Sequence, residues 1–211
     1  MIYRRAVLVI TLVLWLVGCT GAGQTTPDAS YLEDLNGAVF DPPRAISNFG
    51  FASTLGEEFK LSDHNGEIIL LYFGYRTCPD FCPTTFTELR QIYLALGEPA
   101  ERVKVVFITV DPERDDLDSL TLYTQAFHDD FIGLRAEGES LQNVMDEFGV
   151  IAEKRQLADS ALSYLIDHTA SLFLIGPDGR LQVQYLYGTA YQDILEDVQR
   201  ILDSTASSNS S

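Results

Sequence analysis

Two continuous apolar runs mark the middle of the chain. They cover residues 67–75 (EIILLYFGY) and 103–110 (VKVVFITV), and both are rich in β-branched and aromatic residues. Runs of this kind are typical of strands that are covered on both faces, as in a parallel sheet. The pattern therefore predicts two central, parallel strands.

Around these runs, apolar residues recur every three or four positions. This spacing predicts amphipathic helices over residues 83–96, 117–128, 141–148 and 191–202. The first of these segments begins with a proline and is followed by a glycine, which are favoured residues at those two positions. A strand, a helix and a second strand in this order form one parallel crossover unit.

Two further apolar runs flank a turn. They cover residues 170–175 and 181–186, and the segment between them contains the turn residues GPDG. Short apolar runs joined by such a turn favour an antiparallel hairpin. Together with the parallel pair, the hairpin predicts an α/β domain in which helices flank a central mixed sheet.

The N-terminal segment has the pattern of an export leader. Arg4 and Arg5 precede an apolar stretch over residues 6–17, which is shorter than the roughly 20 residues that cross a bilayer. The stretch ends in LVGC, which resembles the lipobox of bacterial lipoproteins. We therefore expect a lipoprotein signal peptide over residues 1–18 and acylation of Cys19, with an uncleaved membrane anchor as the alternative. In both cases the rest of the chain faces an oxidising compartment.

Polar segments flank the predicted domain. Residues 19–43 are expected to comprise the lipidated cysteine and a flexible tether, because they are rich in Gly, Pro, Asp and Thr and show no sustained period. Residues 204–211 are nearly all Ser, Thr and Asn, and we expect them to be disordered. One folded domain over residues 44–203 remains, which suits a chain of 211 residues.

The chain is strongly acidic. It contains 14 Lys and Arg against 31 Asp and Glu, which gives a formal net charge of −17. Binding to nucleic acids and to anionic lipid headgroups depends largely on Lys and Arg side chains that neutralise phosphates. The composition therefore argues against a nucleic acid partner.

Two cysteines lie where the first central strand meets its helix. Cys78 and Cys82 have three residues between them. The carboxyl end of a parallel strand opens a crevice, and the free N–H groups of the following helix favour thiolate over thiol there. A thiolate both attacks disulfides and binds metal ions, so the spacing alone leaves both functions open. A plain stabilising disulfide is the third alternative, although a bridge across so short a loop constrains the unfolded chain little.

A third ligand would make the metal hypothesis specific. Thiolates and a neutral imidazole together suit copper. His168 stands immediately before the predicted strand over residues 170–175, at a loop edge that could face the crevice. His64 lies in a turn-like segment and His128 ends a predicted helix beside two aspartates, so both are interpreted as solvated surface residues.

Acidic residues also occur near these positions. The run DPERDD over residues 111–116 is interpreted as a turn and a helix start capped by Asp115 or Asp116, or as an acidic rim of the site. Carboxylates are hard ligands and suit Cu(I) poorly. Asp167 could orient the His168 ring, but adjacent side chains in extended backbone point in opposite directions.

Four segments, in their order and spacing, resemble the Sco/SenC family. They are YFGYRTCPDFCPTTFTEL, FITVDPERDD, FIGL and DHTASLFLIGPDG. The resemblance covers roughly residues 44–202. It implies a thioredoxin-like fold and copper binding through the two cysteines of a CxxxC motif and a distant histidine. Carried over residue by residue, the metal ligands are Cys78, Cys82 and His168.

The resemblance also implies a function. Family members assist assembly of the dinuclear copper centre of cytochrome c oxidase, so we expect an extracytoplasmic, lipid-anchored copper chaperone of the bacterial cell envelope. Its partner would be the copper-centre subunit of the oxidase or another copper or thiol protein, and its cargo Cu(I) or Cu(II).

Two activities remain open for the dithiol. Reduced Cys78 and Cys82 could pass copper to an acceptor, or they could reduce the acceptor's own cysteines. The alternative function is that of a thiol-disulfide oxidoreductase or thiol peroxidase without a carrier role. Thioredoxin-like oxidoreductases usually have a proline before the strand that faces their CxxC motif, whereas this chain has His168 and Thr169 there. This difference favours metal binding over general thiol exchange.

Overall fold

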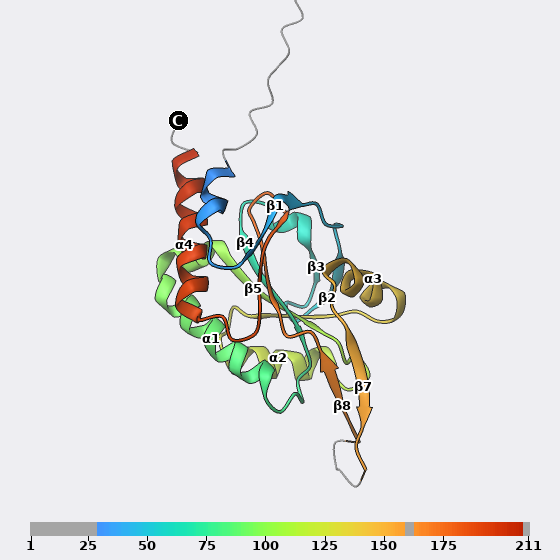
Figure 1. The fold of residues 1–211 in the computed structure, drawn as a ribbon. Coiled ribbons are helices and arrows are strands. Elements are labelled where there is room, and N and C mark those ends of the chain that lie inside the picture. The colour runs from blue at the N-terminus through green and yellow to red at the C-terminus, as the bar shows by residue number, and fades with distance from the viewer. Residues whose placement is uncertain (1–28, 159–162, 209–211) are drawn as a thin grey trace, which may run out of the picture.

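The computed structural model describes residues 29–158 and 163–208, which form an eight-stranded mixed sheet, a two-stranded sheet and four α-helices (Figure 1). In spatial order, the strands of the large sheet are β1 (Ala38–Arg44), β10 (Leu181–Tyr185), β9 (Leu172–Ile175), β4 (Ile68–Gly74), β5 (Val103–Thr109), β6 (Ile132–Arg135), β2 (Gly50–Ser53) and β3 (Glu58–Lys60). The small sheet pairs β7 (Ala152–Gln156) with β8 (Tyr164–His168). The helices are α1 (Phe81–Leu96), α2 (Leu117–Gln125), α3 (Gly138–Phe148) and α4 (Tyr191–Ser208), with short 3-10 helices η1 (Ala29–Asp34), η2 (Leu61–His64) and η3 (Glu98–Arg102).

The centre of the large sheet is formed by β4 and β5. These strands pair in parallel, from Ile68 beside Val103 to Gly74 beside Thr109. Every residue of β4 is buried. The prediction of two central, parallel strands is therefore confirmed. The predicted hairpin is confirmed as well, because β9 and β10 pair antiparallel.

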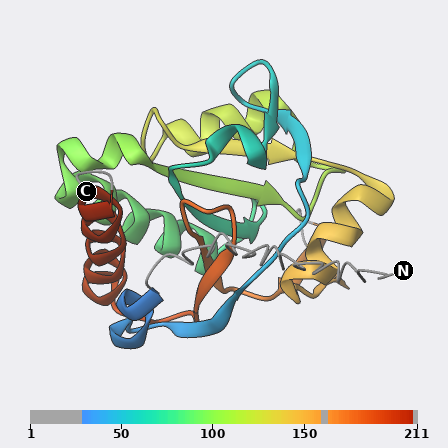
Figure 2. The same cartoon turned by 90° about the horizontal axis from the view of Figure 1, so that it is seen from above.

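Neighbouring side chains of β4 enter two different aromatic layers. Tyr72 packs with Phe107 and with Phe86 of α1, whereas Phe73 packs with Phe148 of α3. Helices α1 and α4 lie beside each other on one side of the sheet, and α3 lies on the other side (Figure 2). This covering of both faces explains why β4 is apolar throughout.

The helix that follows the cysteine loop begins earlier than predicted. It starts at Phe81 rather than at Pro83, so Cys82 lies in its first turn. Pro83 is then the third helical residue, where the missing N–H removes no bond within the helix. The other predicted helix ends shift by a few residues: α2 ends at Gln125, and α3 begins at Gly138.

The tether predicted over residues 19–43 is too long. Both η1 and β1 lie within it, and β1 pairs antiparallel with β10. The buried carboxylate of Asp197 in α4 accepts hydrogen bonds from the N–H groups of Asn36, at 2.9 Å, and Gly37, at 3.3 Å. Leu32 is buried as well. The folded domain therefore includes residues 29–43, because residues far along the chain hold this polar segment.

The tail predicted to be disordered over residues 204–211 is helical in its first part. Helix α4 continues to Ser208. The Thr205 hydroxyl accepts a hydrogen bond from the Arg102 guanidinium at 2.7 Å and donates one to the Leu202 carbonyl at 2.8 Å, and these bonds support the added turn. Residues 209–211 lie outside the described residues.

The predicted signal peptide and the predicted lipidation site Cys19 also lie outside the described residues. Within residues 29–158 and 163–208, no helix combines the length and the apolar character that a membrane crossing requires.

The sequence does not predict the two-stranded sheet. The residues of β7 (AEKRQ) are polar or charged after the first, and four of the five are exposed. Such a segment has no apolar alternation that would mark a half-buried strand. The hairpin projects from the body of the domain (Figure 1) and carries His168 at the end of β8.

Candidate metal centre

Cys78 and Cys82 lie on either side of the start of α1. After β4 the chain turns, with the Cys78 N–H donating a hydrogen bond to the Tyr75 carbonyl at 3.1 Å, and enters the helix at Phe81. Both cysteines are free thiols. Cys82 has no exposed surface, whereas Cys78 is 8% exposed. The structure thus places the pair at the carboxyl end of a central strand, where the sequence predicts it.

His168 faces the two sulfurs from the end of β8. Its Nε2 atom lies 3.6 Å from the Cys82 sulfur, and its Nδ1 atom lies 3.1 Å from the Thr169 carbonyl oxygen. A proton on Nδ1 allows that nitrogen to donate to the carbonyl and leaves the Nε2 lone pair directed at the cysteines. The ligand atoms of Cys78, Cys82 and His168 all lie within 4.8 Å of one another, so the three side chains can hold one metal ion.

A recess of about 290 Å³ leads to this cluster. Cys78 and His168 line the recess, together with Phe81 of α1 and Arg155 of β7. Cys82 is not among the lining residues and lies beneath them. A molecule that enters the recess therefore meets one sulfur and the imidazole first.

The buried side of the cluster is closely packed. The Tyr72 hydroxyl lies 3.8 Å from the Cys82 sulfur, and the rings of Tyr72 and Tyr75 meet the His168 ring nearly edge on. A Cβ atom at Gly74 would lie only 2.7 Å from the Cys82 sulfur. Glycine at the end of β4 is therefore required for the sulfur to reach its position.

The two thiols have opposite pKa shifts. A hydrogen bond from the Cys82 thiol lowers the pKa of Cys78 to about 3. The same hydrogen bond, together with burial, raises the pKa of Cys82. Burial also raises the pKa of Tyr72, which keeps its hydroxyl protonated. At neutral pH the pair thus holds a thiolate on Cys78 and a thiol on Cys82.

The acidic run after β5 has two structural roles. Asp116 caps α2: its side chain accepts a hydrogen bond from the Ser119 N–H at 2.8 Å, and the Ser119 hydroxyl accepts one from the Asp116 N–H at 3.2 Å. The capping interpretation is confirmed for this residue. Asp115 is fully buried and instead accepts hydrogen bonds from the Arg76 N–H and the Thr109 hydroxyl. It therefore fixes the loop that leads to the cysteines.

The other candidate residues lie apart from the cluster. The Asp167 carboxylate binds the Arg155 guanidinium at 3.0 Å across the hairpin, so it does not orient the His168 ring. His64 and His128 each contact an acidic side chain a few residues away in sequence and are not part of the cluster.

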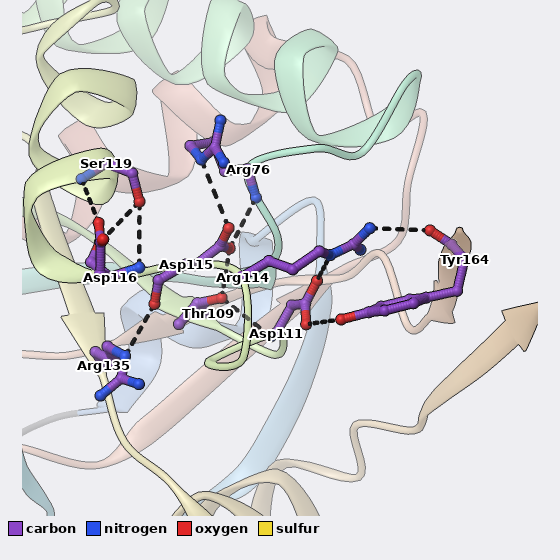
Figure 3. A network of polar contacts seen from close by, with 9 residues as sticks. All are labelled: Arg76, Thr109, Asp111, Arg114, Asp115, Asp116, Ser119, Arg135 and Tyr164. Carbon is purple, nitrogen blue, oxygen red and sulfur yellow. Dashed lines mark hydrogen bonds and ion pairs between the residues drawn. The ribbon is translucent and has the colours of Figure 1, made fainter. Parts of the chain in front are cut away.

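One set of contacts near the site is not predicted from the sequence. Asp111 and Arg114, in the loop after β5, bind Tyr164 at the start of β8 (Figure 3). The parallel pairing of β4 and β5 gives a signal that could have found them. Loops that follow neighbouring parallel strands meet at the same edge of a sheet, so the loops that carry Cys78 and Asp111 must be close together.

Comparison with known proteins identifies close relatives. The SCO1/SenC family model matches residues 39–203. A SCO2-like protein of Rickettsia conorii is 32% identical over 152 residues, which cover 67% of this chain and 74% of that protein.

Solved structures show the same fold. ScoI of Bradyrhizobium japonicum, solved with copper bound, matches with a TM-score of 0.67 and 30% identity and covers 74% of this chain and 99% of its own. Apo Sco1 of Thermus thermophilus matches with a TM-score of 0.66 and 33% identity, over 82% of this chain and 96% of its own. The predicted thioredoxin-like α/β fold is thus confirmed, and the chain belongs to the SCO1/SenC family.

Proposed function

We propose that this protein is a copper chaperone, which binds a copper ion through Cys78, Cys82 and His168 and delivers it to another protein. The observation that carries the proposal is the convergence of two sulfurs and one imidazole nitrogen within 4.8 Å. Thiolates select Cu(I), and imidazole suits copper in general. The copper-bound ScoI of Bradyrhizobium japonicum supports the choice of metal.

The placement of the three ligands suits stepwise release. Cys78 and His168 line the recess, so an acceptor's thiolates can replace them from that side. Cys82 is fully buried and would be the last ligand to let go. Exchange of one ligand at a time keeps the metal bound throughout the transfer.

We propose the acceptor and the location from features of the sequence. Resemblance to the Sco/SenC family makes the copper-centre subunit of cytochrome c oxidase the proposed acceptor, with another copper or thiol protein as the alternative. The LVGC segment supports lipidation of Cys19 after removal of residues 1–18, and hence an extracytoplasmic protein held at a membrane of the bacterial cell envelope.

A second function is favoured by the thiolate on Cys78. This sulfur lines the recess and could attack a disulfide of the acceptor, forming a mixed disulfide and releasing one acceptor thiolate. Attack by Cys82 would then release the second acceptor thiolate and leave a Cys78–Cys82 disulfide. An external thiol reductant would have to return the pair to the dithiol form.

Copper stoichiometry of the reduced protein tests the proposal. The full chain is purified in detergent, loaded with Cu(I) without oxygen and freed of unbound metal. A Cys78→Ala/Cys82→Ala double variant serves as the blank, because it reports copper bound elsewhere, including at Cys19. We expect one tightly held copper above this blank in the wild type and no tightly held copper in Cys78→Ala or His168→Ala, although His168→Ala should still bind copper weakly through its two sulfurs.

Disulfide exchange with a model substrate separates the two functions. His168→Ala should abolish tight copper binding yet leave disulfide exchange largely intact, because the imidazole is a metal ligand rather than an attacking group. No copper above the blank, together with rapid exchange, would contradict the chaperone and favour a thiol-disulfide oxidoreductase. Copper affinity that survives His168→Ala unaltered would contradict the ligand assignment.

A further inference from the structure

The hairpin that carries His168 is not paired with the main sheet. Among the described residues, β7 and β8 form a separate two-stranded sheet. Chain continuity with β9, whose Leu172 pairs with Tyr72 of β4, holds the base of the hairpin, and side-chain contacts fix the rest of the hairpin relative to the cysteines.

One face of the hairpin packs against the body of the domain. Tyr164, Ile166 and His168 alternate along β8 and so lie on the same side of the strand. Ile166 is buried, and its N–H donates a hydrogen bond to the Tyr75 hydroxyl at 3.2 Å. Asp167, on the opposite side of the strand, is exposed. Tyr164 and His168 are thus the two ends of one packed row.

The loop after β5 holds the first end of this row (Figure 3). The Tyr164 hydroxyl donates a hydrogen bond to the Asp111 carboxylate at 2.8 Å, and the Arg114 guanidinium donates one to the Tyr164 carbonyl at 3.0 Å. The same guanidinium lies 3.7 Å from the centre of the Tyr164 ring. Asp111 and Arg114 are themselves joined by an ion pair of 2.5 Å. Tyr164 is therefore held by its ring, its hydroxyl and its backbone.

The same loop also holds the segment that leads to the cysteines. Asp115 accepts hydrogen bonds from the Arg76 N–H at 3.0 Å and from the Thr109 hydroxyl at 2.7 Å. The Arg135 guanidinium donates to the carbonyls of Asp115, at 2.9 Å, and Pro112, at 2.8 Å, which fixes the loop backbone. This loop thus contacts Arg76, two residues before Cys78, and Tyr164, at the start of the strand that ends in His168.

We propose that residues 111–116 form a strut that sets the distance between the cysteine pair and His168, and that Tyr164 is a positioning residue for the imidazole. The inference rests on the proposed copper site and assigns a role to residues that are not metal ligands. A pre-placed third ligand binds copper more tightly than one that must be ordered on binding. Loosening the strut should thus weaken binding through the nitrogen ligand and leave the two sulfur ligands in place.

Tyr164→Phe is the direct test, because it removes the hydroxyl and retains the ring beneath Arg114. Tyr187→Phe, at an exposed tyrosine that packs against Phe81, is the matched control. Using the full chain in detergent, Cu(I) affinity is measured by competition with a chelator of known affinity. We expect Tyr164→Phe to bind copper about 10-fold more weakly, as for loss of one hydrogen bond to a charged group, and the control to match the wild type.

A double-mutant cycle shows whether the effect passes through the imidazole. In the His168→Ala background, Tyr164→Phe should cause no further loss of affinity. Loss of the same size in both backgrounds would overturn the positioning role. Equal affinity of Tyr164→Phe and the wild type would overturn it as well.

Hydrogen exchange of the metal-free protein tests the strut without copper. Tyr164→Phe should speed exchange of the Ile166 amide and of the other β7–β8 amides several-fold, while the β4 and β5 amides keep their rates. Unchanged hairpin exchange would overturn the proposal even if copper binds. If the wild type took up no copper above the blank, the proposed function would fail, and the exchange data would still decide whether the strut holds the hairpin.

Discussion

The cysteine pair and the histidine reach the candidate metal centre from two differently built parts of the protein. Cys78 and Cys82 follow the fully buried strand β4, and Cys82 itself has no exposed surface. His168 ends a small sheet whose first strand is largely exposed. The buried main sheet thus holds the two sulfurs, whereas side-chain contacts between the hairpin and the domain hold the imidazole.

Removing one buried side chain from each part should have the largest effect and tests whether the main sheet and the hairpin differ in their contribution to stability. Leu71→Ala in β4 should lower the free energy of unfolding by about 2–5 kcal/mol, because it empties a buried site in the central sheet. Ile166→Ala in β8 also empties a buried site, but at the margin of the core, so it should lower that free energy less than Leu71→Ala does and should in addition weaken copper binding because it loosens the hairpin. Urea unfolding and Cu(I) competition measure the two effects. Equal losses of unfolding free energy, or unchanged copper binding in Ile166→Ala, would contradict the difference between the two parts.

Adding one carbon at Gly74, the end of β4, tests how closely the main sheet packs around the Cys82 sulfur. A Cβ atom at Gly74 would lie 2.7 Å from the Cys82 sulfur and 2.9 Å from the Phe107 ring, and both neighbours are buried. Gly74→Ala should therefore cost about 1–3 kcal/mol of unfolding free energy and also weaken copper binding. Thermal and urea unfolding test the first effect. Wild-type stability together with full copper affinity would contradict the packing described for Cys82.

The pH dependence of alkylation separates the two thiols. Because a hydrogen bond from Cys82 lowers the pKa of Cys78 to about 3, Cys78 stays a thiolate as the pH falls from 8 to 6. Its rate of reaction with iodoacetamide, measured by mass spectrometry on the metal-free protein, should thus be nearly constant over that range. In Cys82→Ala the pKa should rise, and the rate should fall by up to about 10-fold per pH unit below it. A wild-type rate that falls equally steeply would contradict the hydrogen bond from the Cys82 thiol to the Cys78 thiolate.

The smallest effect is expected at the surface of the hairpin. Lys154 of β7 forms an ion pair with Glu113 of the loop after β5, at 2.5 Å, and both side chains are substantially exposed. Exposed pairs contribute little to stability because water and salt screen them. Lys154→Ala also removes the contact of the Lys154 ammonium with the Tyr164 ring at 4.8 Å, so it should weaken copper binding and speed hairpin hydrogen exchange by much less than Tyr164→Phe does. A loss as large as that of Tyr164→Phe would assign the strut to the Lys154 contacts rather than to the Tyr164 hydroxyl.

The parts of the fold that the sequence predicts are those with a local apolar pattern. Strands β4 and β5, helix α1 and the β9–β10 hairpin follow from runs and periods within a few residues. The N-terminal strand β1 does not, because its second half contains Asp41, Pro42 and Pro43 and shows no apolar alternation. Its preceding turn is held by Asp197, 161 positions from Asn36, and no local pattern records such a contact.

The candidate site likewise contains residues that the sequence indicates locally and residues whose roles depend on distant contacts. Cys78, Cys82 and His168 could be named from residue chemistry, from the strand-to-helix junction and from the family motifs. For the strut, the parallel strands indicate only that the loops of Cys78 and Asp111 meet at one edge of the sheet. Its contacts do not follow from the sequence, because an acidic run such as DPERDD is usually a solvated turn and the burial of Asp115 depends on Arg76 and Thr109 beside it. Strand β8, which ends in His168, is not predicted from the sequence either, since its partner β7 is polar and exposed.

Copper K-edge X-ray absorption of the Cu(I)-loaded chain is the most direct test of the three-ligand site. We predict two sulfur neighbours and one nitrogen neighbour of the copper in the wild type. In His168→Ala the nitrogen contribution should disappear and copper should be held weakly by sulfur alone. A wild-type spectrum without nitrogen, or a nitrogen contribution that persists in His168→Ala, would contradict the site formed by Cys78, Cys82 and His168.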